Sequence, residues 1–541
     1  MEQEAKALWW QTGIIYEVYL RSFQDSTGNG IGDLRGLLGR LDYLQWLGVT
    51  AVWVTPFYPS PMKDLGYDVS DYTGVDPAFG TMADMDELLA ELHRRGMKLI
   101  IDFVPNHTSD QHAWFRESRS SRDNPKRDWY IWKDPKPGGG PPNNWLSVLG
   151  GSAWEWDEST GQYYYHAFLK EQPDLNYRNP EVMEAVLDAM RFWLDKGVDG
   201  VRIDVMWHMA KDEKFRDNPL NPDFKPEMPD CDRLLQLFSC DQPEVQELVA
   251  RFRDLLDQYH ERVMLGELYL PVHRILPYYG VGDKGAHLPG NFQMLLLPWT
   301  VDKLGIAVDQ FEAALPDSAW PNWVLGNHDR PRLVDRAGVG QARVAALLLL
   351  TLRGTPILYY GDEIGMHNVD IPKEEWQDPQ GLNMPDKNMS RDPQRTPMQW
   401  DSSENAGFTT GKPWLRMAED ARRNNVTAQQ AEKDSLLCFY QRLIRLRQGE
   451  PALVLGDYYP VPTEDWSLLA YIRQKEGSVA FLVVLNLTDK PVTFCPQDGR
   501  VQGTVVLSTC NGSTAPQLKS GTVLRPHEGL LARLEQGGPL G

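Results

Sequence analysis

Acidic side chains that could take part in catalysis follow three short apolar segments of the chain. Asp204 ends the segment GVRID, Glu267 follows VMLG, and Asp329 follows VLGNH. A pair of carboxyl groups is the equipment of glycoside hydrolysis, because one group protonates the leaving oxygen while the other attacks the sugar or activates water. A single buried acid is as often a structural partner in an ion pair as it is a catalytic group. Three acids in equivalent positions favour one catalytic site.

The elements that would hold these acids alternate between β-strands and α-helices. Predicted strands cover residues 14–20, 50–54, 98–104, 198–205, 263–268, 320–325 and 356–360, and predicted helices cover 34–47, 85–95, 181–196, 245–256, 341–353 and 435–447. Repeated strand-then-helix order implies parallel strands joined by right-handed crossovers. In a barrel built this way, functional side chains lie at the C-terminal ends of the strands, which is where the three acids fall.

Two segments interrupt this alternation and predict further domains. Residues 107–174 are rich in Trp, Tyr, Gly and Pro and are too long for a plain connection, so we expect an inserted domain. Residues 451–541 contain short β-like segments separated by turn residues, which predict a C-terminal β-sandwich-like domain. The predicted fold class is α/β: a (β/α)8 TIM barrel over residues 1–106 and 175–450, with an inserted subdomain after strand 3 and a C-terminal antiparallel β-domain.

The composition excludes several other classes of protein. A formal net charge of −20 argues against a nucleic-acid partner, since phosphate binding needs a surplus of Lys and Arg. No apolar run is long enough for a membrane span, and the N-terminal residues do not resemble a signal peptide. Five scattered cysteines without a CxxC pair predict reduced thiols and a cytoplasmic protein. The sequence gives no indication of the oligomeric state.

Several motifs resemble those of a known enzyme family. DFVPNH, GVRIDV, GELY and GNHD are similar to the four signature segments of glycoside hydrolase family 13, the α-amylase superfamily, and QPDLN resembles its fifth segment. GDLRG, GYDVSDY, GTPILYYGDEIGM and RTPMQWD extend the resemblance along the chain, which is most similar to the oligo-1,6-glucosidase and α-glucosidase branch. The resemblance implies a retaining, exo-acting α-glucosidase that removes the terminal non-reducing glucose of short malto- or isomalto-oligosaccharides.

The resemblance also implies a role for each acid. Asp204 would be the nucleophile, Glu267 the general acid and base, and Asp329 the carboxylate that stabilises the transition state. Arg202, two residues before Asp204 on the same strand, would lower the pKa of the nucleophile, whereas burial would raise that of Glu267. A retaining mechanism requires the carboxyl groups of Asp204 and Glu267 to lie roughly 5–5.5 Å apart.

Further residues would bind the substrate if the resemblance holds. Arg391 is expected to pair with the acid that grips the terminal glucose and so to close the pocket, which then admits only a chain end. For the two histidines and the phenylalanine of this set, ordinary core packing is the competing interpretation. The set comprises a stacking tyrosine, the gripping acid, the two sugar-binding histidines, an aromatic wall residue and two arginines: Tyr67, Asp68, His107, His328, Phe168, Arg202 and Arg391.

A glycine-rich loop near the N-terminus suggests a structural calcium ion. Oxygen donors alternate along residues 25–33, but the twelfth position is Gly36 and not Glu, so the loop is no EF-hand. It resembles the calcium loop of the oligo-1,6-glucosidase branch, although one donor is a weaker threonine. The alternative is a loop closed by its own turns. The expected ligands are four side chains and one carbonyl group: Asp25, Thr27, Asn29, Asp33 and the carbonyl of Ile31.

Two alternative functions use the same fold. Trehalose synthases, sucrose isomerases and glucosyltransferases share the catalytic acids but transfer the glucosyl group to a sugar. The heavy chains of amino-acid transporters resemble the family without catalysis, but they carry a membrane helix. The resemblance also bears on linkage. In the branch that the chain resembles, a valine after the nucleophile accompanies α-1,6 cleavage and a smaller or polar residue accompanies α-1,4 cleavage. Val205 occupies this position and implies α-1,6 cleavage, whereas the following Met206-Trp207-His208 departs from the usual pattern of that branch.

Overall fold

Eight parallel strands form the central sheet of the computed structural model, which describes residues 7–464, 468–498, 501–510 and 516–534. Their order is β10–β11–β1–β2–β3–β7–β8–β9, so each new strand joins the edge of the preceding one, and strand β1 closes onto β11. This arrangement confirms the predicted (β/α)8 barrel. The strands are β1 (Ile15–Val18), β2 (Ala51–Val54), β3 (Lys98–Phe103), β7 (Gly200–Ile203), β8 (Val263–Gly266), β9 (Leu288–Pro289), β10 (Asn322–Val324) and β11 (Thr355–Tyr359).

The gap between β9 and β10 is bridged by one side chain. The amide of Asn322 donates to the carbonyl of Pro289 at 2.6 Å and accepts the backbone N–H of Asn291 at 3.2 Å. Proline has no N–H to offer a ladder, so a short strand that ends in Pro289 forms few regular β-sheet bonds. A buried asparagine supplies both a donor and an acceptor in their place.

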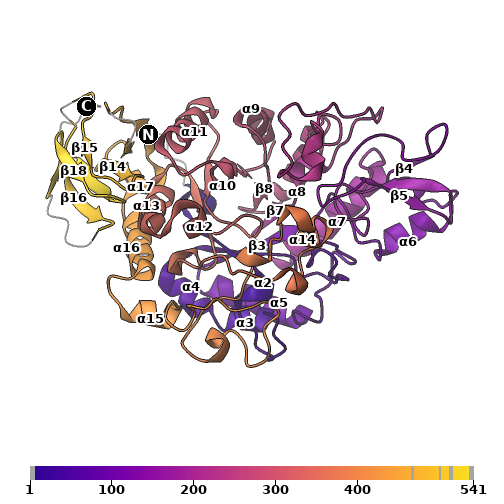
Figure 1. The fold of residues 1–541 in the computed structure, drawn as a ribbon, viewed down its shortest axis with the longest axis horizontal. Coiled ribbons are helices and arrows are strands. Elements are labelled where there is room, and N and C mark those ends of the chain that lie inside the picture. Colours follow the sequence, from indigo (N-terminus) through magenta and orange to yellow (C-terminus); the bar gives the residue numbers. More distant parts are fainter. Residues whose placement is uncertain (1–6, 465–467, 499–500, 511–515, 535–541) are drawn as a thin grey trace.

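Helices surround the barrel (Figure 1). The helix predicted over residues 34–47 is divided into two at Gly39, and the others follow the predicted segments closely. Helix α7 shows why: Asn179 caps its first turn, Pro180 occupies the first position, and Gly197 ends it in the left-handed conformation. The longer helices are α4 (Leu41–Leu47), α5 (Met82–Arg94), α7 (Pro180–Lys196), α8 (Val245–Leu256), α11 (Val301–Ala314), α13 (Ala342–Thr351) and α16 (Leu436–Gly449). Shorter helices are α1 (Trp9–Thr12), α2 (Leu20–Phe23), α3 (Leu34–Leu38), α9 (Val272–Ile275), α10 (Gln293–Leu296), α12 (Leu333–Ala337), α14 (Pro379–Asn383), α15 (Val426–Ala431) and α17 (Pro451–Leu455).

A small antiparallel sheet lies between β3 and α7, at the right-hand end of the molecule in Figure 1. Strands β4 (Trp132–Lys133), β6 (Gln162–Tyr165) and β5 (Trp154–Asp157) pair in that order, beside helix α6 (Ala113–Ser120). Its core is aromatic, with Trp145, Trp154 and Tyr165 buried together. An isolated bridge between His107 and Asp174 brings the two ends of this segment together beside the barrel.

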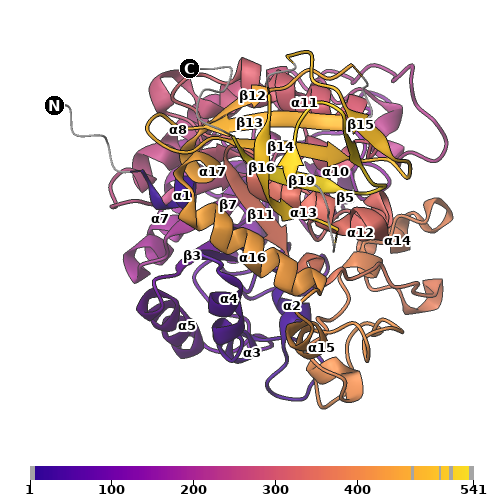
Figure 2. The same cartoon turned by 90° about the vertical axis from the view of Figure 1, so that its left-hand side faces the viewer.

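The C-terminal part of the chain forms a second antiparallel sheet at the opposite end (Figures 1 and 2). Its order is β12–β13–β14–β19–β16–β17, and β15 pairs separately with β18. Alternate side chains of these strands form a core of their own, while Arg473 on β13 donates to the carbonyl of Thr351 on α13. The strands are β12 (Asp457–Pro460), β13 (Leu468–Gln474), β14 (Phe481–Asn486), β15 (Val492–Phe494), β16 (Gly503–Ser508), β17 (Gln517–Leu518), β18 (Thr522–Leu524) and β19 (Gly529–Leu534).

Two further observations concern the sequence predictions. All five cysteines are free thiols. Over the described ranges, the longest helices are too short or too polar to cross a lipid bilayer.

Candidate active site

The nucleophile and acid predicted from the sequence lie side by side at the ends of neighbouring strands. Ile203 on β7 pairs in register with Gly266 on β8, so the next residues along the two strands are Asp204 and Glu267. The backbone N–H of Glu267 still donates to the carbonyl of Ile203 at 3.0 Å, which continues the ladder by one residue. Because adjacent strands are about 4.8 Å apart, this register favours the short carboxyl separation of a retaining enzyme over the wider inverting one.

One buried guanidinium group connects the acids. Arg202 contacts Asp102 at 2.8 Å, Asp204 at 2.5 Å and Glu267 at 2.7 Å. Arg202 and Asp102 pair in register across β7 and β3, so the sheet itself places this arginine under the site. Since each carboxylate is almost completely buried, the shared cation offsets part of the cost of removing three negative groups from water.

Burial controls the protonation of the two acids more strongly than the arginine does. Burial raises the pKa of Asp204 well above its usual range and also raises that of Glu267, while Arg202 lowers both. Arg202 therefore acts on Asp204 in the expected direction, but burial outweighs it and the net pKa is raised. An ionised Glu267 also raises the pKa of Asp204, whereas a hydrogen bond with Asp204 lowers that of Glu267, so the two carboxyl groups titrate as a pair. One proton on two carboxyl groups is the state from which a retaining reaction begins.

Val205, directly after Asp204, has a strained backbone. Its φ of 37° and ψ of 47° lie in the left-handed region, which β-branched residues rarely adopt. In this conformation its N–H donates to Oε2 of Glu267 at 2.8 Å. Strand β7 ends at Ile203, so the turn, and not strand alternation, brings Val205 to the wall of the cavity. The strained conformation thus lets the backbone of Val205 hold Glu267 and places the valine side chain in the cavity wall.

The third acid lies between two arginines. Asp329 accepts from Arg391 at 3.2 Å and from Arg395 at 2.8 Å, and it follows β10 at the same end of the barrel. Although burial raises the pKa of Asp329, His328 and the two arginines lower it further, so the net pKa falls below the usual range. Asp329 is therefore ionised at neutral pH, as a group that stabilises positive charge must be.

The expected pairing of Asp68 with Arg391 is wrong, because Arg391 pairs with Asp64. The carboxylate of Asp68 is fully buried and accepts from the Ser60 hydroxyl at 2.8 Å and from the backbone N–H groups of Lys63 and Asp64 at 2.9 and 3.0 Å. Asp64 lines the cavity and pairs with Arg391 at 2.8 Å, which are the two properties expected of Asp68. Asp68 instead holds the turn that presents Asp64, and burial raises its pKa to about 6.

Arg391 lies in the wall of the cavity, as expected. Besides Asp64 and Asp329 it contacts Asp378 at 2.7 Å, so one guanidinium group joins three carboxylates at the end of the cavity. Asp378 lies just before helix α14, and its burial is offset by Arg391, which keeps its pKa below the usual range. The long segment after β11 therefore closes the pocket with charged groups.

Two predicted histidines and the tyrosine form one group in the cavity wall. The Tyr67 hydroxyl lies 2.8 Å from Nε2 of His328, and the two rings stack with centroids 5.6 Å apart. His328 also contacts Glu17 through Nδ1, at 2.5 Å. His107 lies 3.1 Å from the Tyr67 carbonyl. Burial lowers the pKa of His107 to about 4 and that of His328 to about 3, so both are neutral hydrogen-bonding groups at pH 7.

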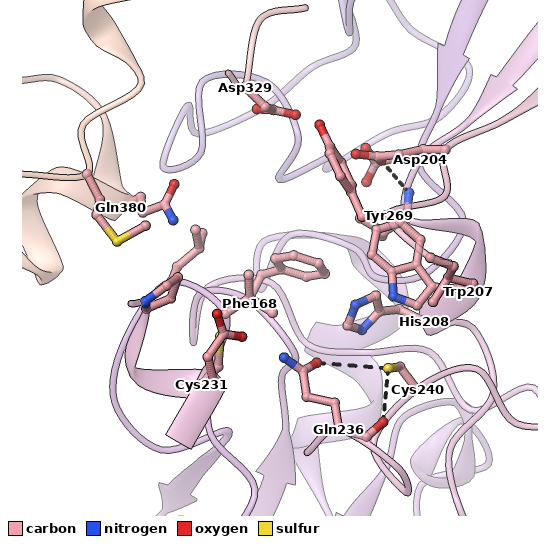
Figure 3. Close-up of a pocket in the computed structure, with 18 of the residues that line it drawn as sticks. Phe168, Asp204, Trp207, His208, Cys231, Gln236, Cys240, Tyr269, Asp329 and Gln380 are labelled. Carbon is pink, nitrogen blue, oxygen red and sulfur yellow. Dashed lines mark hydrogen bonds between the residues drawn. The ribbon is translucent and has the colours of Figure 1, made fainter. Parts of the chain in front are cut away.

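One cavity of about 540 Å³ is lined by these three side chains and by Asp64, Asp204, Glu267, Asp329 and Arg391. Phe168 is half-buried in its wall, with its ring 5.3 Å from that of His107 and 5.2 Å from that of His208. In Figure 3, Asp204, Asp329 and Tyr269 lie on one side of the cavity, and Gln236 and Cys240 lie on the other. A volume of this size accommodates a small ligand such as a disaccharide.

The expected calcium loop is closed by hydrogen bonds of its own. The Asp25 carboxylate accepts three backbone N–H groups of the loop at 2.7–2.8 Å. Asp33 caps α3 by accepting the N–H of Gly36 at 2.7 Å, and the Asn29 side chain accepts that of Ile31 at 2.8 Å. No cluster of three His, Cys, Asp or Glu side chains suited to a metal occurs in the described part of the chain. The oxygens are of the type that calcium prefers, but the loop satisfies them without a metal.

Five residues of the site were not predicted: Glu17, Asp64, Asp102, Asp378 and Arg395. Asp102 and Glu17 lie within strands, each one residue before the last residue of its strand, and their neighbours are apolar. Asp64 and Asp68 both flank Tyr67, so sequence spacing alone does not distinguish the acid that lines the cavity from the acid that supports the turn. To choose Asp64 from the sequence, one would have had to know that Arg391, which is 327 residues away along the chain, lies beside it in the fold.

Comparisons with known proteins agree with this geometry. Residues 17–456 match the family described as Alpha amylase, catalytic domain. The chain is 39% identical over 568 residues to an oligo-1,6-glucosidase of Heyndrickxia coagulans, covering 98% of this chain and all of that one. It is 40% identical over 500 residues to a probable alpha-glucosidase of Rhizobium meliloti (strain 1021), covering 90% of both chains.

Solved structures include enzymes of two kinds. The alpha-glucosyl transfer enzyme XgtA superposes with a TM-score of 0.91 at 38% identity, covering 98% of this chain and all of that one. The isomaltulose synthase SmuA from Protaminobacter rubrum superposes with a TM-score of 0.90 at 33% identity over the same shares. The chain belongs to the α-amylase family, glycoside hydrolase family 13, and it is a glycoside hydrolase related to α-glucosidases and oligo-1,6-glucosidases.

Proposed function

We propose that the protein is a retaining, exo-acting α-glucosidase that hydrolyses the terminal non-reducing glucose of short malto- or isomalto-oligosaccharides. The observation that carries this proposal is the arrangement at the end of the cavity. Asp64, Arg391 and Asp329 form a charged group beyond the catalytic pair, and such a group fits the hydroxyls of one terminal glucose. The register that aligns Asp204 with Glu267 supports retention.

The reaction follows from these positions. The Asp204 carboxylate attacks the anomeric carbon while Glu267 donates its proton to the leaving oxygen, so the glycosidic bond breaks as the bond to Asp204 forms. Glu267, now ionised, takes a proton from water, whose oxygen displaces Asp204 and releases α-glucose. Positive charge develops on the sugar in both steps, and the ionised Asp329 stabilises it. Arg202 holds both working carboxylates throughout.

Product analysis distinguishes hydrolysis from transfer. We expect purified protein incubated with maltose, isomaltose, sucrose or trehalose to release glucose, and Asp204→Asn, which is nearly isosteric, to release none. Trehalose from maltose, or isomaltulose from sucrose, as the main product would replace this proposal with the isomerase alternative. That alternative is kept because the structures with high similarity include an isomaltulose synthase.

We propose that the enzyme cleaves α-1,6 linkages, including the bond in isomaltose, and that maltose is a second substrate. Val205 supports it, since its stiff side chain lies in the cavity wall next to the nucleophile. We expect Val205→Thr to raise the ratio of maltose to isomaltose hydrolysis, by an amount within the tenfold to 200-fold that about 1–3 kcal/mol allows. An unchanged ratio would remove Val205 as the determinant.

We further propose that the loop of residues 25–33 binds a structural calcium ion. The loop contains two carboxylates and an amide oxygen, and calcium would add ligand bonds to a loop that already has a defined shape. We expect calcium to raise the melting temperature over that in EDTA, and Asp33→Asn to abolish the difference. Equal melting temperatures in calcium and EDTA would refute the site.

Five free thiols support a cytoplasmic location, where cysteines stay reduced. Fractionation of the source cells with an activity assay tests this location, and activity confined to the medium or the periplasm would contradict it.

A further inference from the structure

A row of buried polar side chains leads from strand β1 to the cavity. Oε1 of Glu17 on β1 lies 2.5 Å from Nδ1 of His328. Nε2 of the same imidazole lies 2.8 Å from the Tyr67 hydroxyl and 3.5 Å from Oδ2 of Asp329. The Tyr67 hydroxyl also donates to Oδ2 of Asp102 at 3.1 Å. Because each hydrogen bond in this row needs one proton, the contacts themselves restrict where the protons lie.

An ionised Glu17 leaves several of these contacts without a proton. His328 would then carry its proton on Nδ1 and donate it to Glu17, and its bare Nε2 would take the single proton of Tyr67. No proton would remain between Tyr67 and Asp102, and the bare Nε2 would face the ionised Asp329. Oε2 of Glu17, which has no hydrogen-bond partner among the described residues, would be a buried charged oxygen. Each of these arrangements costs free energy.

A proton on Glu17 supplies every contact in the row. Its protonated Oε1 donates to Nδ1 of His328, and Nε2 of His328 then carries the imidazole proton and directs it towards Tyr67 and Asp329. Tyr67 keeps its own proton for Asp102. Only the uncharged Oε2 of Glu17 is left without a partner, which costs less than leaving a carboxylate oxygen in the same place.

The surroundings of Glu17 favour the same protonation. Its side chain is completely buried, and burial raises its pKa well above the usual range. The negative charges of Asp329 and Asp102 raise this pKa further, and only the more weakly acting Arg202 and a hydrogen bond lower it. The residues in register with Glu17 on β2 and β11 are a tryptophan and a tyrosine, which add no charge.

Stacking alone does not determine which way the His328 ring faces. The ring stacks on Tyr19 and on Tyr67, with centroids 5.8 and 5.6 Å away and interplanar angles of 25° and 13°. Half a turn of the imidazole about its bond to Cβ keeps this plane but exchanges each nitrogen with a carbon atom. The hydrogen bond to Glu17 selects one of the two orientations, because it holds Nδ1 on the side of β1.

We infer that Glu17 is a positioning residue, which donates its proton to Nδ1 of His328 and so presents the Nε2–H of His328 to Asp329 and to the bound glucose. This inference deepens the proposed α-glucosidase function, on which the contact with glucose rests. His328 lines the cavity, so its Nε2–H is a donor for a sugar hydroxyl and for the carboxylate that stabilises the transition state. The opposite tautomer would turn a lone pair towards that carboxylate.

The tautomer of His328 tests this inference without any substrate. Nitrogen NMR of protein labelled with nitrogen-15 at histidine distinguishes a protonated ring nitrogen from a bare one. The signals of His328 are those that disappear in His328→Gln. We expect Nε2 to be protonated and Nδ1 to be bare at neutral pH. A bare Nε2 would overturn the inference, and so would protons on both nitrogens, since Glu17 would then have given its proton away.

Two variants of Glu17 separate positioning from shape. In Glu17→Gln the amide N–H replaces the carboxyl proton as the donor to Nδ1, so we expect kcat/KM on maltose to stay within about threefold of that of the unmodified enzyme. Glu17→Met has a similar shape but no donor, and we expect kcat to fall roughly tenfold, which corresponds to one hydrogen bond. In a His328→Gln background the same change should have no further effect, because Glu17 acts through this histidine.

Glu363→Met is the matched control for loss of a buried glutamate. Glu363 follows β11 and accepts from the Tyr16 hydroxyl at 2.7 Å and from the Tyr43 hydroxyl at 2.6 Å, but it does not line the cavity. Loss of these bonds should lower the melting temperature and leave kcat of the folded enzyme unchanged. Equal losses of kcat in Glu363→Met and Glu17→Met would overturn the positioning role, as would a Glu17→Gln variant as impaired as Glu17→Met.

Failure of this inference and failure of the proposed function give different results. Release of glucose by a protein whose His328 has the opposite tautomer, or whose kcat does not change in Glu17→Met, overturns the role of Glu17 and leaves the α-glucosidase proposal standing. Absence of glucose from every α-glucoside overturns the proposed function, and the NMR measurement then decides alone whether Glu17 donates to His328.

Discussion

Substitution of Asp64 tests the revised position of the acid that grips the terminal glucose. Its two carboxylate oxygens contact Arg391 at 2.8 Å and the Gln172 amide at 3.1 Å. Asp64→Asn keeps an oxygen for Arg391 and removes the negative charge that the sugar hydroxyls would meet. Hydrogen bonds to charged groups contribute about 1.5–3 kcal/mol, so we expect kcat/KM on maltose to fall about 10- to 150-fold. Arg391 retains Asp378 and Asp329, so the fold should hold.

Asp68→Asn is the matched comparison, with the same chemical change four residues away. The three donors that contact Asp68 use both of its oxygens, and asparagine has only one. At least one donor loses its acceptor, which costs about 1–3 kcal/mol of stability. We therefore expect Asp68→Asn to lower the melting temperature by a few degrees and kcat/KM by less than tenfold.

Steady-state kinetics on maltose and calorimetric melting of both variants decide between the two assignments. The structure predicts a mainly kinetic defect for Asp64→Asn and a mainly structural one for Asp68→Asn. The reverse result, with full activity in Asp64→Asn and a large loss in a stable Asp68→Asn, would refute the assignment drawn from the Arg391 contact.

Two other predictions follow from the protonation of buried groups. Glu267→Gln should lose about 10²–10⁴-fold in kcat on maltose but far less on nitrophenyl α-glucoside, whose leaving group needs little protonation; equal losses would exclude Glu267 as the acid. Burial lowers the pKa of His166 to about 4, against about 6.5 when unfolded, so the unfolded chain binds the proton first and stability present above pH 6.5 is lost as the pH falls towards 4. The melting temperature should fall over that window and fall less steeply in His166→Gln, and identical slopes in the two proteins would contradict this cause.

The barrel was predictable because its signals are local. Helix α8 begins at Val245 and ends at Leu256, as its apolar spacing predicts, and Gly197 ends α7 because it adopts a left-handed conformation that other residues avoid. Strand β9 and helix α11 were not predicted. A strand of two residues is too short to show periodicity in the sequence. Its neighbour β10 is joined to it by a hydrogen bond from the Asn322 side chain, and no sequence pattern predicts such a bond.

The meeting of Asp204, Glu267 and Asp329 at one cavity was predictable for the same reason, since each follows a strand end. The parts of the site that depend on distant segments were not. Arg391 could be selected from its motif, but its partner among Asp64 and Asp68 depended on how the turn of residues 60–68 folds. The protonation of Asp204 also required the structure, because burial and Glu267 outweigh the adjacent Arg202 only once the site is assembled.

The anomeric form of the first product tests the central claim most directly. Proton NMR of maltose or isomaltose hydrolysis, recorded before mutarotation proceeds, reports whether the anomeric carbon has been displaced twice or once. A nucleophilic Asp204 aligned with Glu267 predicts α-glucose as the initial product. β-Glucose appearing first would show a single displacement by water and would contradict the retaining mechanism assigned to this pair.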